Sequence, residues 1–146
     1  MLALLVATLS LSAQDLVKKS DNKYYKNGSL FTGNQIEYFD NGNIKSNRNF
    51  DQGLETGISL YFHENGEKKE EQSFKDGLKN GLWITWNAQG IKTAEARFDN
   101  GLKHGKWMIY DDSGKPRYEI HYDMGKKAGN WYMWDENGKL VSEKKY

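Results

Sequence analysis

The chain has 146 residues, the length of one ordinary domain, and its 37% hydrophobic content and mean hydropathy of -0.89 are low for a globule with a deep core. Its 21 basic and 20 acidic residues nearly balance, so no net field gathers nucleic acid or an anionic membrane over a distance. The absence of cysteine excludes disulfides, iron–sulfur clusters, cysteine zinc sites and thiol catalysis.

The first segment, residues 1–11, reads MLALLVATLSL, an uncharged apolar run followed by Ser12-Ala13 and a polar stretch. A membrane-spanning helix needs about 20 apolar residues, so this shorter run favours a cleaved signal peptide over an anchor. We expect cleavage near Ala13, export to the periplasm, the cell surface or the medium, and a linker over residues 14–24. No basic residue precedes the run, and the alternative is a buried N-terminal strand or helix of a cytoplasmic protein.

The remainder of the chain repeats with a period of 24 residues, without insertions. Two aromatic series and one glycine series share this period, which is typical of a repeat architecture. The first aromatic series is Tyr38, Phe62, Trp86, Tyr110 and Trp134; the second is Phe50, Phe74, Phe98, Tyr122 and Tyr146; the glycines are Gly33, Gly57, Gly81, Gly105 and Gly129.

Each period has the pattern of a β-hairpin. In one copy, a glycine-containing turn over residues 99–105 precedes a strand over 106–110, a DDSG turn and a returning strand over 115–122. Nine Tyr, six Phe and five Trp beside fifteen Gly also favour strands joined by tight turns. The sequence therefore predicts an all-β fold, an elongated single-layer sheet of five tandem hairpins. Their predicted bounds are 25–50, 51–74, 75–98, 99–122 and 123–146.

Strand alternation predicts which side chains share a face. We expect the even positions of both strands, such as Ile84 and Phe98, to form one apolar inner face, while the Glu95 column faces solvent. A second column lies opposite Ile84 and is a candidate partner-binding strip, because contiguous exposed aromatics usually mark contact sites. The alternative is that the strip packs on itself between units. Its residues are Trp83, Trp107, Trp131, Tyr61, Ile109 and Met133.

The segments GLKNGLWITW, GLKHGKWMIY and GKKAGNWYMW, each followed by a turn and a returning strand, resemble the MORN-repeat variant family over residues 25–146. In bacteria that family includes YwqK-type antitoxins. More broadly, the resemblance implies extended hairpin sheets that act as protein-binding or lipid-associating modules. The first unit departs most, since Gly28 and Gly33 are spaced by five residues and Gln35 stands where later units carry Trp. We expect this unit to act as an N-terminal cap.

The sequence carries no motif that predicts catalysis, a metal site or a cofactor. His63, His104 and His121 occupy three different positions of the repeat, so the period does not bring them together. The glutamates of the returning strands have lysines nearby and are interpreted as a solvated charge ladder. We therefore expect a protein that is not an enzyme.

These patterns predict an exported repeat scaffold that binds another protein, whose identity is open, through the Trp strip. The C-terminal edge strand is a second candidate surface, which would also allow self-association. One alternative is an antitoxin-like protein that sequesters a toxin by direct contact, although an exported protein does not reach a cytoplasmic toxin. The other is a lipid-surface-associating module, for which the net charge of +1 provides little attraction.

Overall fold

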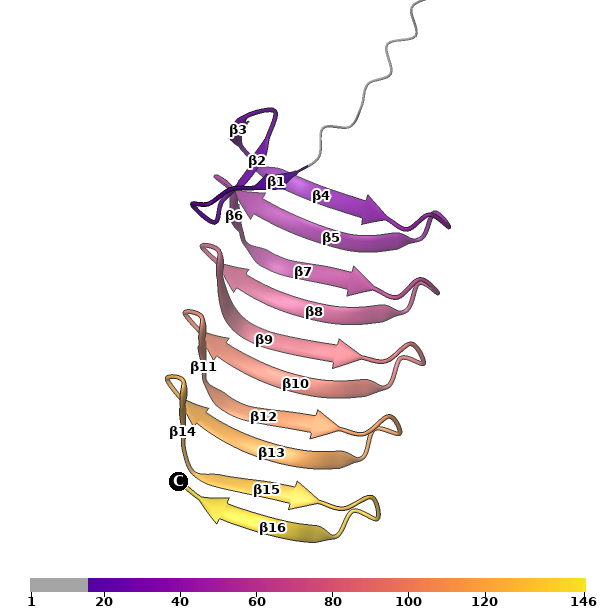
Figure 1. The fold of residues 1–146 in the computed structure, drawn as a ribbon, viewed down its shortest axis with the longest axis vertical. Helices are drawn as coiled ribbons and strands as arrows, with labels where there is room; N and C mark the ends of the chain where they lie inside the picture. Colours follow the sequence, from indigo (N-terminus) through magenta and orange to yellow (C-terminus); the bar gives the residue numbers. More distant parts are fainter. Residues whose placement is uncertain (1–15) are drawn as a thin grey trace, which may run out of the picture.

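The computed structural model describes residues 16–146, in which strands and turns build two antiparallel sheets (Figure 1). The expected signal peptide lies outside the described residues. Within them, no helix is long and apolar enough to cross a membrane. The larger sheet has 13 strands, ten of which form five consecutive hairpins. These are β4 (Gly33–Tyr38) with β5 (Ile44–Asp51), β7 (Gly57–Phe62) with β8 (Lys68–Lys75), β9 (Leu78–Trp86) with β10 (Lys92–Asp99), β12 (Gly105–Tyr110) with β13 (Pro116–Asp123), and β15 (Asn130–Trp134) with β16 (Leu140–Lys145).

The hairpins follow one another along a single open layer, and each strand pairs with its neighbours in sequence. Short strands β6 (Leu54–Glu55), β11 (Leu102–Lys103) and β14 (Lys126–Lys127) lie in the connections between units. The predicted all-β fold of five tandem hairpins in one layer is confirmed. We number the hairpins as units 1 to 5 from β4/β5 to β15/β16.

The N-terminal part of the described chain differs from the prediction. Residues 14–24 were expected to be a linker, but β1 (Val17–Lys18), β2 (Tyr24–Lys26) and β3 (Ser29–Leu30) form a separate three-stranded meander. The first hairpin accordingly begins at Gly33 and not at residue 25. A tight turn at Asn27 and Gly28, with φ of 55° and 79°, closes β2 and β3, and β1 pairs with the other side of β2.

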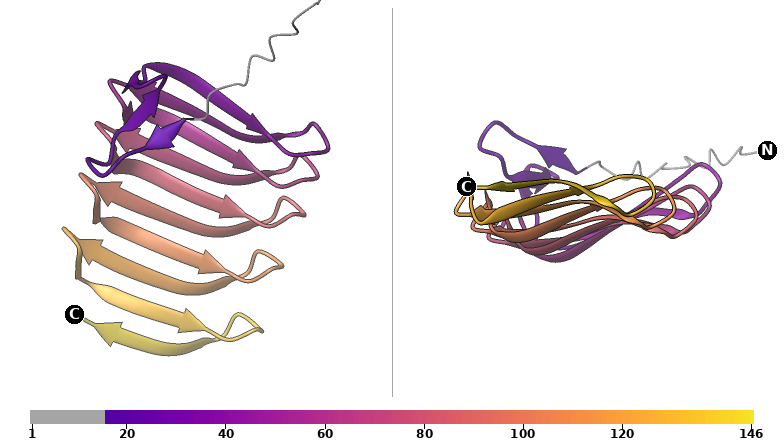
Figure 2. Two further views of the ribbon diagram at one scale, coloured as in Figure 1. Left: turned by 45° about the horizontal axis from the view of Figure 1, so that its top comes forward. Right: turned by 90° about the horizontal axis from the view of Figure 1, so that it is seen from below.

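The meander folds back onto the large sheet instead of extending it (Figure 2). The Tyr24 amide donates to the Gly53 carbonyl at 2.8 Å, and the Gly53 amide donates to the Phe31 carbonyl at 2.8 Å. Gly53 has φ of 77°, and a Cβ atom there would lie 2.9 Å from the Tyr24 carbonyl oxygen, so this approach favours glycine. The strands bow, and the meander lies on the side toward which their ends curve (Figure 2, right).

Two kinds of turn connect the strands. Between units, both central turn residues have positive φ, as in Asn100 (45°) and Gly101 (84°), which suits the twist of antiparallel strands. Met124 occupies the same place at 43°, a conformation that a methionine tolerates poorly. At the other end of the hairpins in units 1 to 3, asparagine side chains reach the next turn. Asn41 Nδ2 donates to the Glu64 carbonyl at 2.9 Å, and Asn65 Nδ2 to the Ala88 carbonyl at 2.8 Å.

The strand register overturns the predicted grouping of the two faces. Within unit 3, Trp83 pairs with Ala96 and Ile84 pairs with Glu95. Residues paired across two strands point to the same face of the sheet. In these pairs an odd-numbered residue of one strand is opposite an even-numbered residue of the other. The expected inner face of even positions in both strands is therefore wrong. Phe98 lies on the face of Trp83, and Ile84 lies on the face of Glu95. A one-residue change of register exchanges the faces of a whole strand, and alternation within single strands does not determine it.

The fully buried part of the sheet is small and lies beneath the meander. Phe50 is the only buried large hydrophobic residue between 16 and 146, with 3% of its surface exposed. The buried polar residues are Ser46, Glu55 and Ser59, all in units 1 and 2. A single layer has no second sheet to cover it, so the remaining strands keep part of both faces in solvent.

Candidate binding face

One face of the sheet carries a continuous series of aromatic rings, and we call it the ladder face. Rings from β8 to the residue after β16 alternate between the second aromatic series and the tryptophans. Their successive centroids are 6.0, 5.1, 5.1, 5.2, 6.0 and 4.9 Å apart, within the range of favourable aromatic contact. The rings belong, in order, to Phe74, Trp83, Phe98, Trp107, Tyr122, Trp131 and Tyr146.

The structure places the three predicted tryptophans inside this ladder. Each lies between two rings of the second series and does not contact the next Trp directly. The indole nitrogen of Trp107 donates to the Arg97 carbonyl at 2.9 Å, and that of Trp131 to the His121 carbonyl at 3.3 Å. This is the geometry of the packing alternative, because the rings are held by neighbours on both sides and stay only partly exposed.

A lysine lies over each tryptophan of the ladder. The Nζ atoms of Lys79, Lys103 and Lys127 are 3.8, 4.6 and 4.3 Å from the centroids of the Trp rings, and each is within 5.0 Å of the next ring. Burial lowers the pKa of Lys79; Glu70 opposes this shift, and the charge of Lys103 adds to it. The sequence interpretation missed this column, although its members also recur every 24 residues.

Beside the ladder, units 4 and 5 form an apolar groove of about 370 Å³. Ile109 and Met133, two residues of the predicted strip, line it together with Trp131. Tyr118 and Ile120, which the prediction did not include, also line it from β13, the strand between those of Ile109 and Met133. Ile109 exposes 38% and Tyr118 40% of its surface. Such open apolar side chains on a rigid sheet are suited to contact with a partner.

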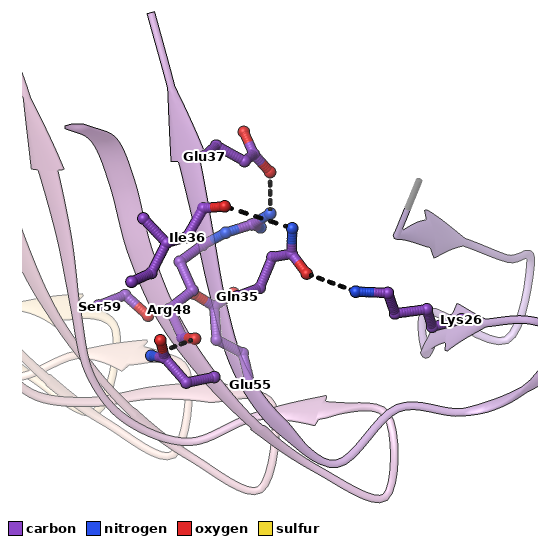
Figure 3. A network of polar contacts seen from close by, with 8 residues as sticks. Lys26, Gln35, Ile36, Glu37, Arg48, Glu55 and Ser59 are labelled. Carbon is purple, nitrogen blue, oxygen red and sulfur yellow. Dashed lines mark hydrogen bonds and ion pairs between the residues drawn. The ribbon is translucent and has the colours of Figure 1, made fainter. Parts of the chain in front are cut away.

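The ladder face has a different character in units 1 and 2, where the meander covers it (Figure 3). Arg48 forms an ion pair with Glu37 at 2.8 Å and lies 5.3 Å from the centroid of the Phe50 ring. The Ser59 hydroxyl donates to the buried carboxylate of Glu55. In the 24-residue repeat, Ser59 thus stands at the position of a later tryptophan, and Glu55 stands at the position of a later lysine.

Tyr61, the remaining residue of the predicted strip, belongs to this covered cluster. Its pKa is raised to about 12, chiefly by burial and then by the nearby Glu55 carboxylate, while the positive charge of Arg48 opposes the shift. Thr85 stands between Tyr61 and Ile109 in the repeat register. The strip predicted as one surface is therefore divided, with Tyr61 in the covered part and Ile109 and Met133 in the open groove.

Units 1 and 2 contribute Phe50 and Phe74 but no tryptophan, and rings of the meander and of the residue after it pack against Phe50 instead. Tyr24 and Phe31 lie 4.8 and 5.6 Å from the Phe50 ring, centroid to centroid. Gln35 and Ser59 stand at the positions of the later tryptophans, and Ser59 is fully buried. The capping role expected of the first unit stays a prediction, and the meander, which packs on Phe50, would share it.

The model of the MORN repeat variant family matches residues 31–52, 55–76, 103–124 and 127–146, more than half of the chain. The chain belongs to the MORN repeat variant family. The curated proteins include no significant match to it. The four matched MORN repeats follow the 24-residue phase of the ladder, and unit 3, between the second and third matches, pairs its strands in the same register.

MORN repeats are repeat modules involved in binding, and the chemistry of this MORN face agrees with such a role. Its groups are rings, aliphatic side chains and ammonium groups. In the described part of the chain, no three His, Cys, Asp or Glu residues converge to hold a metal ion. The histidines lie apart: His63 contacts the Trp86 carbonyl, His104 lies 3.5 Å from Asp123, and His121 contacts Glu119.

Proposed function

We propose that this MORN-repeat protein is a non-enzymatic, exported scaffold that binds another protein through the ladder face of units 3 to 5. The apolar groove of units 4 and 5 is the observation that carries the proposal. Its walls come from four neighbouring strands of one sheet, so the free protein already holds the contact residues in place. A pre-formed surface loses little conformational freedom on binding.

The tryptophans and the groove residues have separate roles in this proposal. The indoles of Trp83, Trp107 and Trp131 maintain the ladder, since neighbouring rings already cover both of their sides. A partner instead contacts the open edges of Ile109, Tyr118 and Met133 and the exposed flank of Trp131. Aromatic anchors surrounded by aliphatic side chains are the usual centre of a protein interface.

Substitutions in the groove test this proposal against a matched pair on the opposite face. The double variant I109S/Y118S removes two half-exposed groove residues. The control I36S/Y38S removes an isoleucine and a tyrosine that expose 37% and 59% of their surface on the other face. We expect proteins captured from an extract of the source organism by the wild type to be retained by the control and lost by the groove variant. Equal capture by the wild type and both variants would contradict the proposal that the partner binds in the groove.

Export is tested separately by the intact mass and cell fraction of the native protein. The proposal expects a mature chain beginning near Gln14 outside the cytoplasm. An uncleaved chain in the cytosol would contradict export. Such a result would instead favour the antitoxin-like alternative, in which the same groove sequesters a toxin.

The outer strand β16 is a further surface for association. All of its residues from Leu140 to Lys145 are exposed, and β15 is its only partner in the described sheet. Self-association through β16 stays a prediction. It would appear as a concentration-dependent mass in sedimentation, unaffected by the I109S/Y118S change.

A further inference from the structure

The lysines over the ladder have no acidic partner. Within residues 16–146, Lys79, Lys103 and Lys127 form no ion pair with a carboxylate, whereas Lys68 and Lys92 pair with Glu71 and Glu95 on the opposite face. The register explains the difference, because the glutamates of β10 and β13 alternate away from the ladder. Units 3 to 5 therefore present three ammonium groups above aromatic rings, and Glu70 of β8, which lies on the ladder face, is a carboxylate whose charge acts on Lys79.

The spacing of these lysines is regular. Each recurs after two strands, and neighbouring strands of a sheet lie about 4.8 Å apart, so the column has a period of about 10 Å. An extended segment in the polyproline II conformation rises about 3.1 Å per residue with three residues per turn, and it repeats after about 9 Å. A segment running across the strands would therefore bring every third side chain over a lysine.

The geometry points to this column as a binding site for an extended protein segment with a carboxylate at every third residue. The inference rests on the proposed function, since it specifies the partner that the ladder face takes. The acidic side chains would meet Lys79, Lys103 and Lys127, while intervening apolar side chains would enter the groove of units 4 and 5.

The covered half of the molecule shows that this face accepts an extended segment. There the chain's own β2 donates its Tyr24 amide to the Gly53 carbonyl and packs the Tyr24 ring against Phe50, while Phe31, which follows β3, packs against the same ring. The meander also projects from this face (Figure 2, right). A flat membrane would meet the meander before it reached the lysines, so a protein segment fits the open half better than a lipid surface.

The experiment titrates the full chain with two synthetic peptides of the same composition, following tryptophan fluorescence. One peptide has glutamate at every third position in a background of proline and alanine, and the other has its glutamates clustered. We expect saturable, salt-sensitive binding of the periodic peptide and clearly weaker binding of the clustered one. K103Q should weaken binding of the periodic peptide about tenfold, the effect of losing one charge-assisted contact.

Two variants control for the loss of fold. K103R keeps the charge over Trp107 and should bind like the wild type. K68Q removes a lysine that lies 5.0 Å from the centroid of the Trp86 ring on the opposite face, and it should leave binding unchanged. Circular dichroism of each variant shows whether the sheet is retained.

Several outcomes would overturn the inference. Equal affinity for both peptides would show that the column does not recognise the spacing. Binding to anionic phospholipid vesicles in the absence of peptide binding would assign the lysines to a lipid surface. If no acidic peptide binds at millimolar concentration while partner capture still depends on Ile109 and Tyr118, the proposed function stands and this inference fails. If the periodic peptide binds but the I109S/Y118S variant captures the partner as well as the wild type does, the groove proposal fails instead.

Discussion

The two halves of the ladder face use one repeat in different ways. In units 1 and 2 the meander covers the face, and small, polar or charged side chains accompany the buried Phe50 beneath it: Ser46, Arg48, Glu55 and Ser59. In units 3 to 5 the face is open and carries tryptophans beneath lysines. Phe50 in the covered half packs against rings of another segment, whereas the open units pack their rings against tryptophans of the repeat. The same backbone thus provides a cap at one end and a surface at the other.

The largest expected effect separates the covered half from the open one. Phe50 and Tyr146 are equivalent in the repeat, but Phe50 is buried under Tyr24 and Phe31, whereas Tyr146 is exposed and contacts Trp131. F50A should lower the free energy of unfolding by about 3–5 kcal/mol. Y146A should lower it by only about 0.5–1 kcal/mol. Urea titrations followed by circular dichroism measure both. Similar losses would show that the meander does not stabilise unit 1.

A smaller effect is expected within the open half. Trp107 stacks between Phe98 and Tyr122 beneath Lys103, and two aromatic contacts together contribute about 1–3 kcal/mol. W107A should therefore lower the unfolding midpoint in urea, and W107F should restore part of it. If W107A lost partner capture without any change of the unfolding midpoint, Trp107 would be a residue that contacts the partner and not one that stabilises the sheet.

The covered half should also differ in its response to alkaline pH. The pKa of Tyr61 is raised to about 12, chiefly by burial and then by Glu55. The folded state therefore holds the phenol proton more tightly than the unfolded chain, whose ordinary value is about 10. Its stabilisation is fully present below pH of about 10 and is lost as the pH rises toward 12. An absorbance titration of tyrosinate should show a late step that is missing in Y61F, and an unchanged curve would contradict the burial of Tyr61.

The smallest effect is expected in the turn between units 4 and 5, which contains Met124. Met124 is exposed and has φ of 43°, where Asn100 stands in the preceding connection. Because asparagine tolerates left-handed φ better than methionine does, M124N should stabilise the protein by about 0.5–1 kcal/mol. The reverse change N100M should destabilise it by a similar amount. Thermal unfolding checks both, and opposite signs would show that the turn is not strained.

Sequence reasoning identified the repeat but not all of its surroundings. The five hairpins, their turns and the three tryptophans of the ladder follow from the 24-residue period. The linker expected at 14–24 was wrong, because β1 and β2 are too short to show strand periodicity. The lysine column and the groove residues Tyr118 and Ile120 were missed, since their importance depends on which face they share with the rings.

Local residue patterns are sufficient to predict the number of hairpins and the place of each turn. Paired turn residues such as Asn100-Gly101 adopt positive φ locally, and the aromatic strands between them have few other stable conformations. Which side chains of neighbouring strands lie on the same face follows from the pairing register of the strands. That register includes the irregularity between Lys92 and Ala94, and it could be read only from the folded sheet. The tertiary structure also decided which half of the ladder face is covered, since the meander reaches Phe50 by folding back over the sheet, a contact that no local pattern specifies.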